Sequence, residues 1–277
     1  EHKVICGDAL DRASYERLMG AERAQMVFAD APYNVKVRSV VGRGRRRYRE
    51  FGQASGEKSK AAFTEFLTTA LGLMAAHSID GSLHFLCMDW RHQAEMCAAI
   101  DSVFGQLVNM AVWVKPTGGM GSLYRSAHEL IFISKKGAAA HVNNIQLGKH
   151  GRTRTNVWTY DRPVQFGRET QEARFASNHP TPKPVAMIAD AIMDATNRGA
   201  IVLDGFLGSG STVIAADRVG RRCYGIELDP RYVDLTIRRF EHVTSKAARH
   251  ANGKTFAQIA KQRGVAIPAS TDRRRKR

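Results

Sequence analysis

Short apolar segments alternate along this chain with segments whose apolar residues recur at helical spacing. The strand-like segments are residues 3–6, 25–29, 82–88, 107–114, 129–134, 201–203 and 223–227. The helix-like segments are residues 61–77, 91–104, 184–196, 210–219 and 231–244. Strands that alternate with helices predict an α/β sandwich with a mostly parallel sheet. Periodicity fades between residues 137 and 178, which predicts an inserted module.

Four acidic residues, Asp8, Asp30, Asp204 and Glu227, follow or end these apolar segments. In open parallel sheets, ligands bind at the carboxyl ends of the strands. We therefore expect the four carboxylates to gather around one ligand-binding edge of the sheet.

A glycine-rich turn follows residues 201–203 and leads directly into a helix. Gly208 and Gly210 carry no side chain, so the backbone can approach a ligand closely. Glu227 ends the next strand, and its carboxylate can accept hydrogen bonds from both hydroxyls of a ribose. The turn lacks the Walker pattern and the G-x-G-x-x-G pattern, which disfavours a phosphate loop and a dinucleotide site. These features predict a nucleoside site, although glycines also occur at such turns for packing alone.

The turn after residues 25–29 reads Asp30-Ala31-Pro32-Tyr33. Pro32 has a fixed φ and pushes Ala31 toward an extended conformation. Asp30 and the Ala31 carbonyl can each accept an N–H of a nucleobase amino group, which orients the nitrogen lone pair toward an electrophile. Tyr33 can stack on the base. The alternative is a plain Asp-initiated turn with a buried tyrosine.

Together the two turns resemble the signatures of the DNA amino-methyltransferases that use S-adenosylmethionine. That family's catalytic signature is Asp-Pro-Pro-Tyr, and residues 30–33 read Asp-Ala-Pro-Tyr. Its cofactor signature, Asp-Pro-Phe-x-Gly-Ser-Gly-Thr, is similar to residues 204–211. The catalytic motif comes first, which is the order of the permuted β-class of bacterial adenine-N6 methylases. Shorter matches at residues 7–10, 179–184 and 225–227 extend the resemblance over residues 3 to 240.

The resemblance implies a Rossmann-like methyltransferase sandwich that binds S-adenosylmethionine. It implies a catalytic half (1–136), a target-recognition insert (137–178), a cofactor-binding half (179–250) and a basic C-terminal tail (251–277). The implied catalytic residues are Asp30, Ala31, Pro32 and Tyr33. The implied cofactor-binding residues are Asp8, Ala9, His179, Lys183, Asp204, Phe206, Gly208, Ser209, Gly210, Ser211, Glu227 and Leu228.

The implied reaction is methylation of the N6 amino group of an adenine flipped out of double-stranded DNA, as in restriction–modification. Asp30 favours adenine, because serine is the usual residue there in the family's cytosine-N4 enzymes. No cysteine lies in a Pro-Cys turn, which disfavours thiol chemistry at cytosine C5. Ala31 and Gly205 stand where the signatures have proline and remove rigidity from both turns. These two residues leave a non-catalytic DNA-binding protein open as an alternative. Methylation of cytosine N4 or of an RNA base is a separate alternative.

Positive charge supports a nucleic-acid partner. The chain has 42 Lys and Arg against 26 Asp and Glu, a formal net charge of +16. One basic cluster covers residues 36–49 and another residues 152–174, and clustered arginines neutralise phosphates well. The residues predicted to contact DNA are Arg43, Arg45, Arg46, Arg47, Arg152 and Arg154.

Other classes of protein are disfavoured by the sequence. The four cysteines are scattered and show no metal-ligand spacing, which indicates reduced thiols and no metal site. No apolar run reaches the ~18 residues of a membrane span, and the first residues do not resemble a signal peptide. We expect a cytoplasmic, nucleoid-associated bacterial protein, and the family resemblance is compatible with a homodimer. Residue 1 lies almost at a strand, so we expect the chain to be a segment of a longer protein.

Overall fold

The computed structural model describes residues 1–36, 52–119, 123–149, 153–161 and 182–266. Its strands form one eight-stranded sheet in the order β1-β8-β7-β2-β3-β5-β4-β6. The strands are β1 (Lys3–Cys6), β2 (Ala24–Ala29), β3 (Ser78–Met88), β4 (Leu107–Val114), β5 (His128–Lys135), β6 (Val157–Thr159), β7 (Ile201–Asp204) and β8 (Arg222–Glu227). Among these strands only β5 runs opposite to its neighbours. The predicted α/β fold with a mostly parallel sheet is confirmed.

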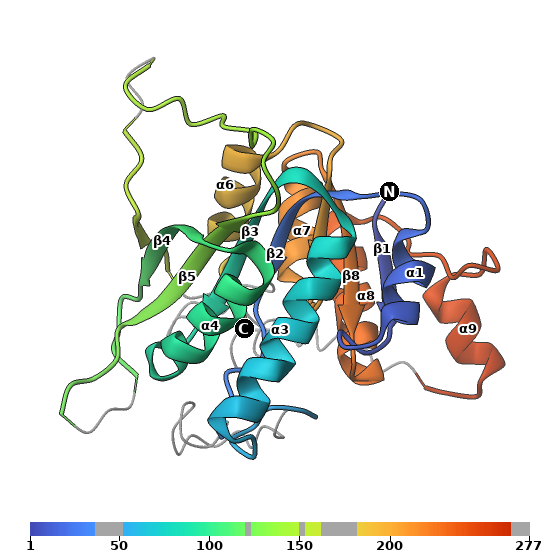
Figure 1. The fold of residues 1–277 in the computed structure, drawn as a ribbon. Helices are drawn as coiled ribbons and strands as arrows, with labels where there is room; N and C mark the ends of the chain where they lie inside the picture. The colour runs from blue at the N-terminus through green and yellow to red at the C-terminus, as the bar shows by residue number, and fades with distance from the viewer. Residues whose placement is uncertain (37–51, 120–122, 150–152, 162–181, 267–277) are drawn as a thin grey trace, which may run out of the picture.

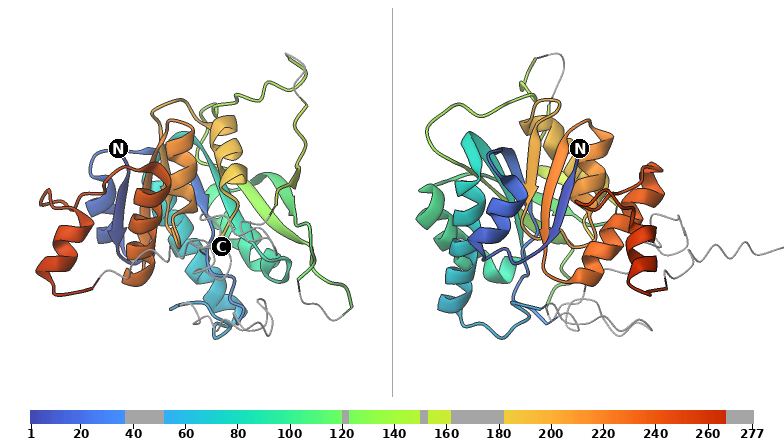
Figure 2. Two further views of the ribbon diagram at one scale, coloured as in Figure 1. Left: turned by 180° about the vertical axis from the view of Figure 1, so that it is seen from behind. Right: turned by 90° about the vertical axis from the view of Figure 1, so that its right-hand side faces the viewer.

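Helices cover both faces of the sheet (Figures 1 and 2). On one face lie α1 (Arg12–Met19), α3 (Lys60–Ala76) and α4 (Gln93–Phe104), which follows the short 3-10 turn η1 (Trp90–His92). On the other lie α6 (Val185–Ala195), α7 (Ser211–Arg218) and α8 (Pro230–Thr244), while α9 (Phe256–Gln262) lies at the side of the molecule.

The central strand β2 is buried between these layers. Val27 and Ala29 belong to the apolar core under α1 and α3, whereas Met26 and Phe28 belong to the core under α6 and α7. A strand buried on both faces reads as a continuous apolar run, which is why residues 25–29 were recognisable in the sequence.

The predicted strands and helices are present, with only small shifts at their ends. The sequence reading missed α1, β6 and α9, which are short. Helix α1 begins at the Asp11 cap, whose carboxylate accepts hydrogen bonds from Ala13 N and Ser14 N. Helix α9 begins with a capping box of Thr255 and Gln258, so part of the predicted tail 251–277 is helical. The arginine-rich end of that tail, beyond residue 266, lies outside the described residues.

The segment predicted as a target-recognition insert begins at the edge of the sheet where the parallel strands start. Strand β5 ends there, because Lys135 pairs with Leu83, which in turn pairs with Met26 near the beginning of β2. The Asn144 amide then donates to the carbonyls of Met193 and Thr196 at the end of α6 (2.8 and 2.9 Å). Only from β6 onward, parallel to β4, does the chain return toward the opposite edge. Figure 1 shows residues 137–149 as the long excursion at the upper left.

None of the described helices is both long and apolar enough to cross a membrane.

Candidate active site at the carboxyl edge of the sheet

Strand direction gathers the acidic residues at one edge. Asp30 follows β2, Asp204 ends β7 and Glu227 ends β8, and these three parallel strands are near neighbours in the sheet. Asp8 follows β1, whose last residue Cys6 pairs with Glu227. The expected grouping of four carboxylates at the carboxyl ends of the strands is therefore confirmed by the topology.

The glycine-rich turn after β7 is packed tightly against helix α8. Gly208 and Gly210 both have positive φ (55° and 78°), which favours glycine. A Cβ at position 210 would lie 2.6 Å from Cγ2 of Thr236, and the Thr236 hydroxyl donates to the Gly208 carbonyl (3.0 Å). Any side chain at position 210 would therefore displace either the turn or the helix.

Arg239, a buried residue of α8, also holds this turn in place. Nη1 of Arg239 donates to the carbonyl of Ser209 (3.0 Å) and to the hydroxyls of Ser209 (3.2 Å) and Ser211 (3.0 Å). The two serines predicted to bind cofactor therefore direct their hydroxyls toward α8. The sequence reading missed Arg239, because a lone arginine in a helix resembles any solvated residue.

Glu227 stands beside the turn with its carboxylate partly occupied. Its two oxygens accept hydrogen bonds from Gly208 N and Asp229 N, each at 2.8 Å. Burial raises its pKa. Each carboxylate oxygen has a further lone pair, so Glu227 can still accept the hydroxyls of a ribose.

Asp8 and two apolar side chains complete this part of the edge. The Asp8 carboxylate accepts from Leu10 N (2.9 Å) and from the amide of Gln53 (3.0 Å). Phe206 is half-buried and lies against Phe66, while Leu228 is 42% exposed. An acid for the ribose with apolar surfaces for a purine fits an adenosine group, so the residues present fit S-adenosylmethionine.

Asp204 lies inside the turn and not on its surface. Its oxygens accept from Phe206 N (2.9 Å) and from the hydroxyl of Thr212 (2.6 Å), and the residue is only 3% exposed. Burial raises its pKa to about 7. The structure thus places Asp204 where it closes the turn internally, while its predicted cofactor contact stays a prediction.

Gly205, which stands where the signature has proline, has no room for a side chain. A Cβ there would lie 2.9 Å from the hydroxyl oxygen of Tyr15 and 3.1 Å from Sδ of Met74. Tyr15 is fully buried, and its hydroxyl donates to the Ala9 carbonyl (3.1 Å). We expected position 205 to be less rigid without the proline of the signature. In the structure, close packing against Tyr15 restrains Gly205.

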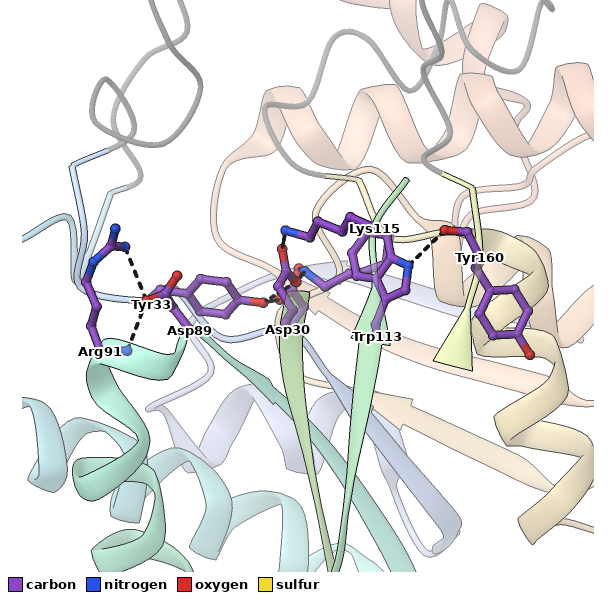
Figure 3. A network of polar contacts seen from close by, with 9 residues as sticks. Asp30, Tyr33, Asp89, Arg91, Trp113, Lys115 and Tyr160 are labelled. Atoms are coloured by element: carbon purple, nitrogen blue, oxygen red, sulfur yellow. Dashed lines mark hydrogen bonds and ion pairs between the residues drawn. The ribbon is translucent and has the colours of Figure 1, made fainter. Parts of the chain in front are cut away.

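The Asp30–Tyr33 corner is held by a buried polar network (Figure 3). The Tyr33 hydroxyl contacts Asp30 Oδ1 (2.6 Å) and Glu129 Oε2 (3.0 Å). Nζ of Lys183 lies 2.5 Å from Asp30 Oδ2 and 3.0 Å from Glu129 Oε2. The ammonium of Lys115 pairs with the other oxygen of Glu129.

The two carboxylates of this network differ electrostatically. The ammonium groups of Lys183 and Lys115 lower the pKa of Glu129 to about 2, against the opposing effect of burial. Burial and the charge of Glu129 raise the pKa of Asp30, although Lys183 opposes them. Burial also raises the pKa of Tyr33, and the two carboxylates raise that of Lys183.

The sequence reading missed Glu129 and Lys115 and assigned Lys183 to the cofactor. Strand β5 is antiparallel, so its first residues lie at the same edge as the last residues of β2, and Lys115 follows the end of β4 beside it. No local sequence pattern indicates that a strand runs antiparallel to its neighbours. The proximity of Glu129 and Lys115 to Asp30 therefore became visible only in the folded structure. Lys183 contacts the Asp30 corner directly, and a cofactor contact for it stays a prediction.

Most of the residues predicted to contact DNA cannot be placed. Arg43, Arg45, Arg46, Arg47 and Arg152, together with the predicted cofactor residue His179, lie outside the described residues. Arg154 is described: its Nε lies 2.5 Å from Asp194 Oδ2, and its guanidinium lies 5.2 Å from the ring centre of Trp158. Arg154 thus contacts α6 within the protein, and a DNA contact for it stays a prediction.

Comparisons with known proteins agree with this geometry. Residues 24–238 match the model of the N6/N4 family described as DNA methylase. The chain is 33% identical over 291 aligned positions to the DNA adenine methyltransferase YhdJ of Escherichia coli (strain K12), covering 94% of this chain and 88% of that protein. It is 26% identical over 240 positions to the type II methyltransferase M2.DpnII of Streptococcus pneumoniae, covering 80% and 84%.

Solved structures share the fold at low sequence identity. The M1.HpyAVI–SAM complex superposes with a TM-score of 0.62 at 18% identity, covering 87% of this chain and 99% of that one. The cytosine-N4-specific PvuII DNA methyltransferase superposes with a TM-score of 0.63 at 17% identity, covering 87% and 89%.

Proposed function

The chain belongs to the N6/N4 DNA methylase family, and from this premise we propose that it methylates the N6 amino group of adenine in DNA. The observation that carries the proposal is the half-buried Asp30–Tyr33 corner, which lies beside the glycine-rich turn on the neighbouring strands β2 and β7. The adenine-specific name of the relative YhdJ supports adenine as the target.

The carboxylate of Asp30 and the carbonyl of Ala31 receive the two N–H groups of the target amino nitrogen. They direct its lone pair toward the methyl donor and stabilise the positive charge that develops on nitrogen. The ring of Tyr33, whose hydroxyl is held by Asp30 and Glu129, offers a fixed surface for stacking the base.

The residues around Glu227 hold the methyl donor. S-adenosylmethionine bound there would supply an electrophilic methyl carbon attached to a sulfonium. Glu227 accepts the ribose hydroxyls, Asp8 faces the adenine, and Gly208 and Gly210 let the backbone approach closely.

We extend the proposal to the partner and the place of action. Double-stranded DNA is the substrate, with the target base extruded, because the amino group of a paired adenine is buried in the duplex. A net charge of +16 supports binding to phosphates and association with the bacterial nucleoid. The same hypothesis assigns target recognition to residues 137–178. It also includes assembly of the protein as a homodimer.

The test is product analysis. Purified protein is incubated with S-adenosylmethionine and, in separate reactions, with mixed-sequence duplex DNA or RNA, and the digested nucleosides are identified by mass spectrometry. N6-methyldeoxyadenosine supports the proposal, N4-methyldeoxycytidine or methylated RNA alone replaces it with the corresponding alternative, and no product in any substrate refutes it.

Asp30→Ala supplies the residue-level prediction. Cofactor affinity measured by calorimetry should change less than about threefold, whereas methyl transfer should fall by about 100-fold or more, because the amino group loses its charged acceptor. Full transfer by this variant would remove Asp30 from the mechanism.

A further inference from the structure

Glu129 is a buried carboxylate beside the half-buried Asp30 at the proposed reacting centre, and its surroundings suggest a task distinct from that of Asp30. It comes from the start of β5, on the far side of Asp30 from the cofactor residues. Its side chain contacts Lys115, Lys183 and Tyr33. Figure 3 labels two of these partners, Tyr33 and Lys115, which come from different elements.

Tyr33 has one hydroxyl proton, whereas two carboxylate oxygens lie within hydrogen-bond distance of its hydroxyl oxygen. The hydroxyl oxygen of Tyr33 lies 2.6 Å from Asp30 Oδ1 and 3.0 Å from Glu129 Oε2. The Lys183 ammonium is likewise divided between the two carboxylates, at 2.5 and 3.0 Å. The Tyr33 hydroxyl can therefore donate to only one of the two carboxylates at a time, while the positive charge of Lys183 stabilises both of them.

Lys115 makes the surroundings of the two carboxylates unequal, because it contacts Glu129. It pairs with Glu129 on the oxygen that faces away from the shared donors, so Glu129 has a cation that Asp30 lacks. A carboxylate with two ammonium partners holds its negative charge more firmly than one with a single shared partner. The geometry thus separates the roles of two neighbouring acids.

We propose that Glu129 is a positioning residue for methyl transfer: a fixed anion that shares Lys183 and the Tyr33 hydroxyl with Asp30 and thereby leaves Asp30 as the proton acceptor for the target amino group. The inference rests on the proposed function. It deepens that function, because it names the residue that tunes Asp30 and holds Tyr33 in place.

The electrostatics of the site support this assignment. The pKa of Glu129 is lowered to about 2 and that of Asp30 is raised, which is the separation expected for a fixed anion beside a proton acceptor. The groups that face Asp30 come from several elements: Tyr33 on the corner, Cys87 on β3, Glu129 on β5, Lys183 before α6 and Asp204 on β7.

The proton balance gives Asp30 its role. As the C–N bond forms, the amino nitrogen becomes positively charged and must lose one of its two protons. That proton passes to an oxygen of Asp30 and then to solvent as the product leaves. A proton on Glu129 would instead break its pairing with Lys115 and Lys183.

The first test measures Asp30 itself and needs neither cofactor nor DNA. In protein with 13C-labelled aspartate side chains, the Asp30 carboxyl resonance is identified by its absence in Asp30→Asn and followed from pH 4 to 9. Glu129→Gln removes a neighbouring negative charge, so Asp30 should titrate about one pH unit lower. Lys115→Met leaves Glu129 to draw Lys183 more strongly, so Asp30 should titrate at a higher pH.

Opposite shifts from two neighbouring substitutions are not a result of loosened packing. Glu95→Gln and Lys136→Met are the matched controls, because Glu95 pairs with His92 and Lys136 donates to the Ser78 carbonyl, both outside the network. Both controls should leave the Asp30 titration unchanged. An Asp30 resonance that titrates at the same pH in wild type, Glu129→Gln and Lys115→Met overturns the proposal.

The second test follows single-turnover methylation of duplex DNA across the same pH range. Glu129→Gln should lower the maximal rate by about tenfold and move its acidic limb to lower pH, with cofactor affinity unchanged. Lys115→Met should move the acidic limb to higher pH. A loss of rate at every pH without a shift of the acidic limb contradicts the proposal. If the wild-type protein makes no N6-methyladenine, the proposed function is refuted, and the Asp30 titration then decides on the role of Glu129.

Discussion

Replacing Asp204 with asparagine should make the protein more stable at alkaline pH. The carboxyl of Asp204 is buried inside the glycine-rich turn, and burial raises its pKa from 3.8 to about 7. Between these two values the native state holds a proton that the unfolded chain has lost, so native stability decreases as pH rises. Asparagine nearly matches the protonated carboxyl in shape and carries no charge to bury.

The magnitude follows from the two pKa values. One pKa unit corresponds to about 1.4 kcal/mol, so the free energy of unfolding of the wild type should lose about 2.5 kcal/mol between pH 5 and pH 8 through this group alone. Asp204→Asn does not lose that amount. Relative to wild type, the variant should therefore gain about 2.5 kcal/mol over this range.

Urea denaturation at pH 5, 6.5 and 8 measures this difference, with cofactor left out so that binding does not contribute. Asp11→Asn is the matched control, because Asp11 caps α1 and its hydrogen bonds to the Ser14 hydroxyl and the Ala13 amide lower its pKa. A carboxylate whose pKa is lowered in the native state loses its stabilising effect only as the pH falls below about 3.8, the ordinary pKa of aspartate. The effect of Asp11→Asn on the free energy of unfolding should therefore be constant from pH 5 to 8. An equally constant difference for Asp204→Asn would refute the argument.

Two further predictions concern the glycine-rich turn. Gly210→Ala should reduce cofactor affinity in calorimetry by about 100-fold or more, because the new Cβ would lie 2.6 Å from Thr236 and would move the backbone that approaches the cofactor; affinity within threefold of wild type contradicts this reading. Gly205→Pro, which restores the family signature, should lower the melting temperature through its contact with the Tyr15 hydroxyl. Tyr15→Phe should partly relieve that loss in the double variant, and additive effects of the two substitutions would exclude the contact as its cause.

The fold shows where the described residues 137–149 lie relative to the Asp30 corner. Residues 137–149 leave the sheet at the edge opposite Asp30, and Asn144 binds the end of α6. The chain returns to the catalytic side only after β6. Residues 137–149 therefore lie away from the Asp30 corner, at the opposite edge of the sheet.

Local patterns in the sequence were sufficient for the main architecture. The continuous apolar run of β2 and the helical spacing of α3 reflect burial, and burial leaves the same pattern wherever a strand or helix stands in the sheet. The acids at strand ends and the two glycines with positive φ are equally local, so the two signature turns and their family could be recognised before the fold was known. Strand β6 has only three residues, which are too few to show a period.

The partners of those motifs were decided by the tertiary structure alone. Glu129 meets Asp30 because one strand of the sheet is reversed, and Lys183 joins them across 153 positions of sequence. Arg239 and Tyr15 likewise support the glycine-rich turn from helices far along the chain. The local sequence specifies the conformation of a turn, but which charges face that turn depends on strand order and direction, and these result from packing the whole chain.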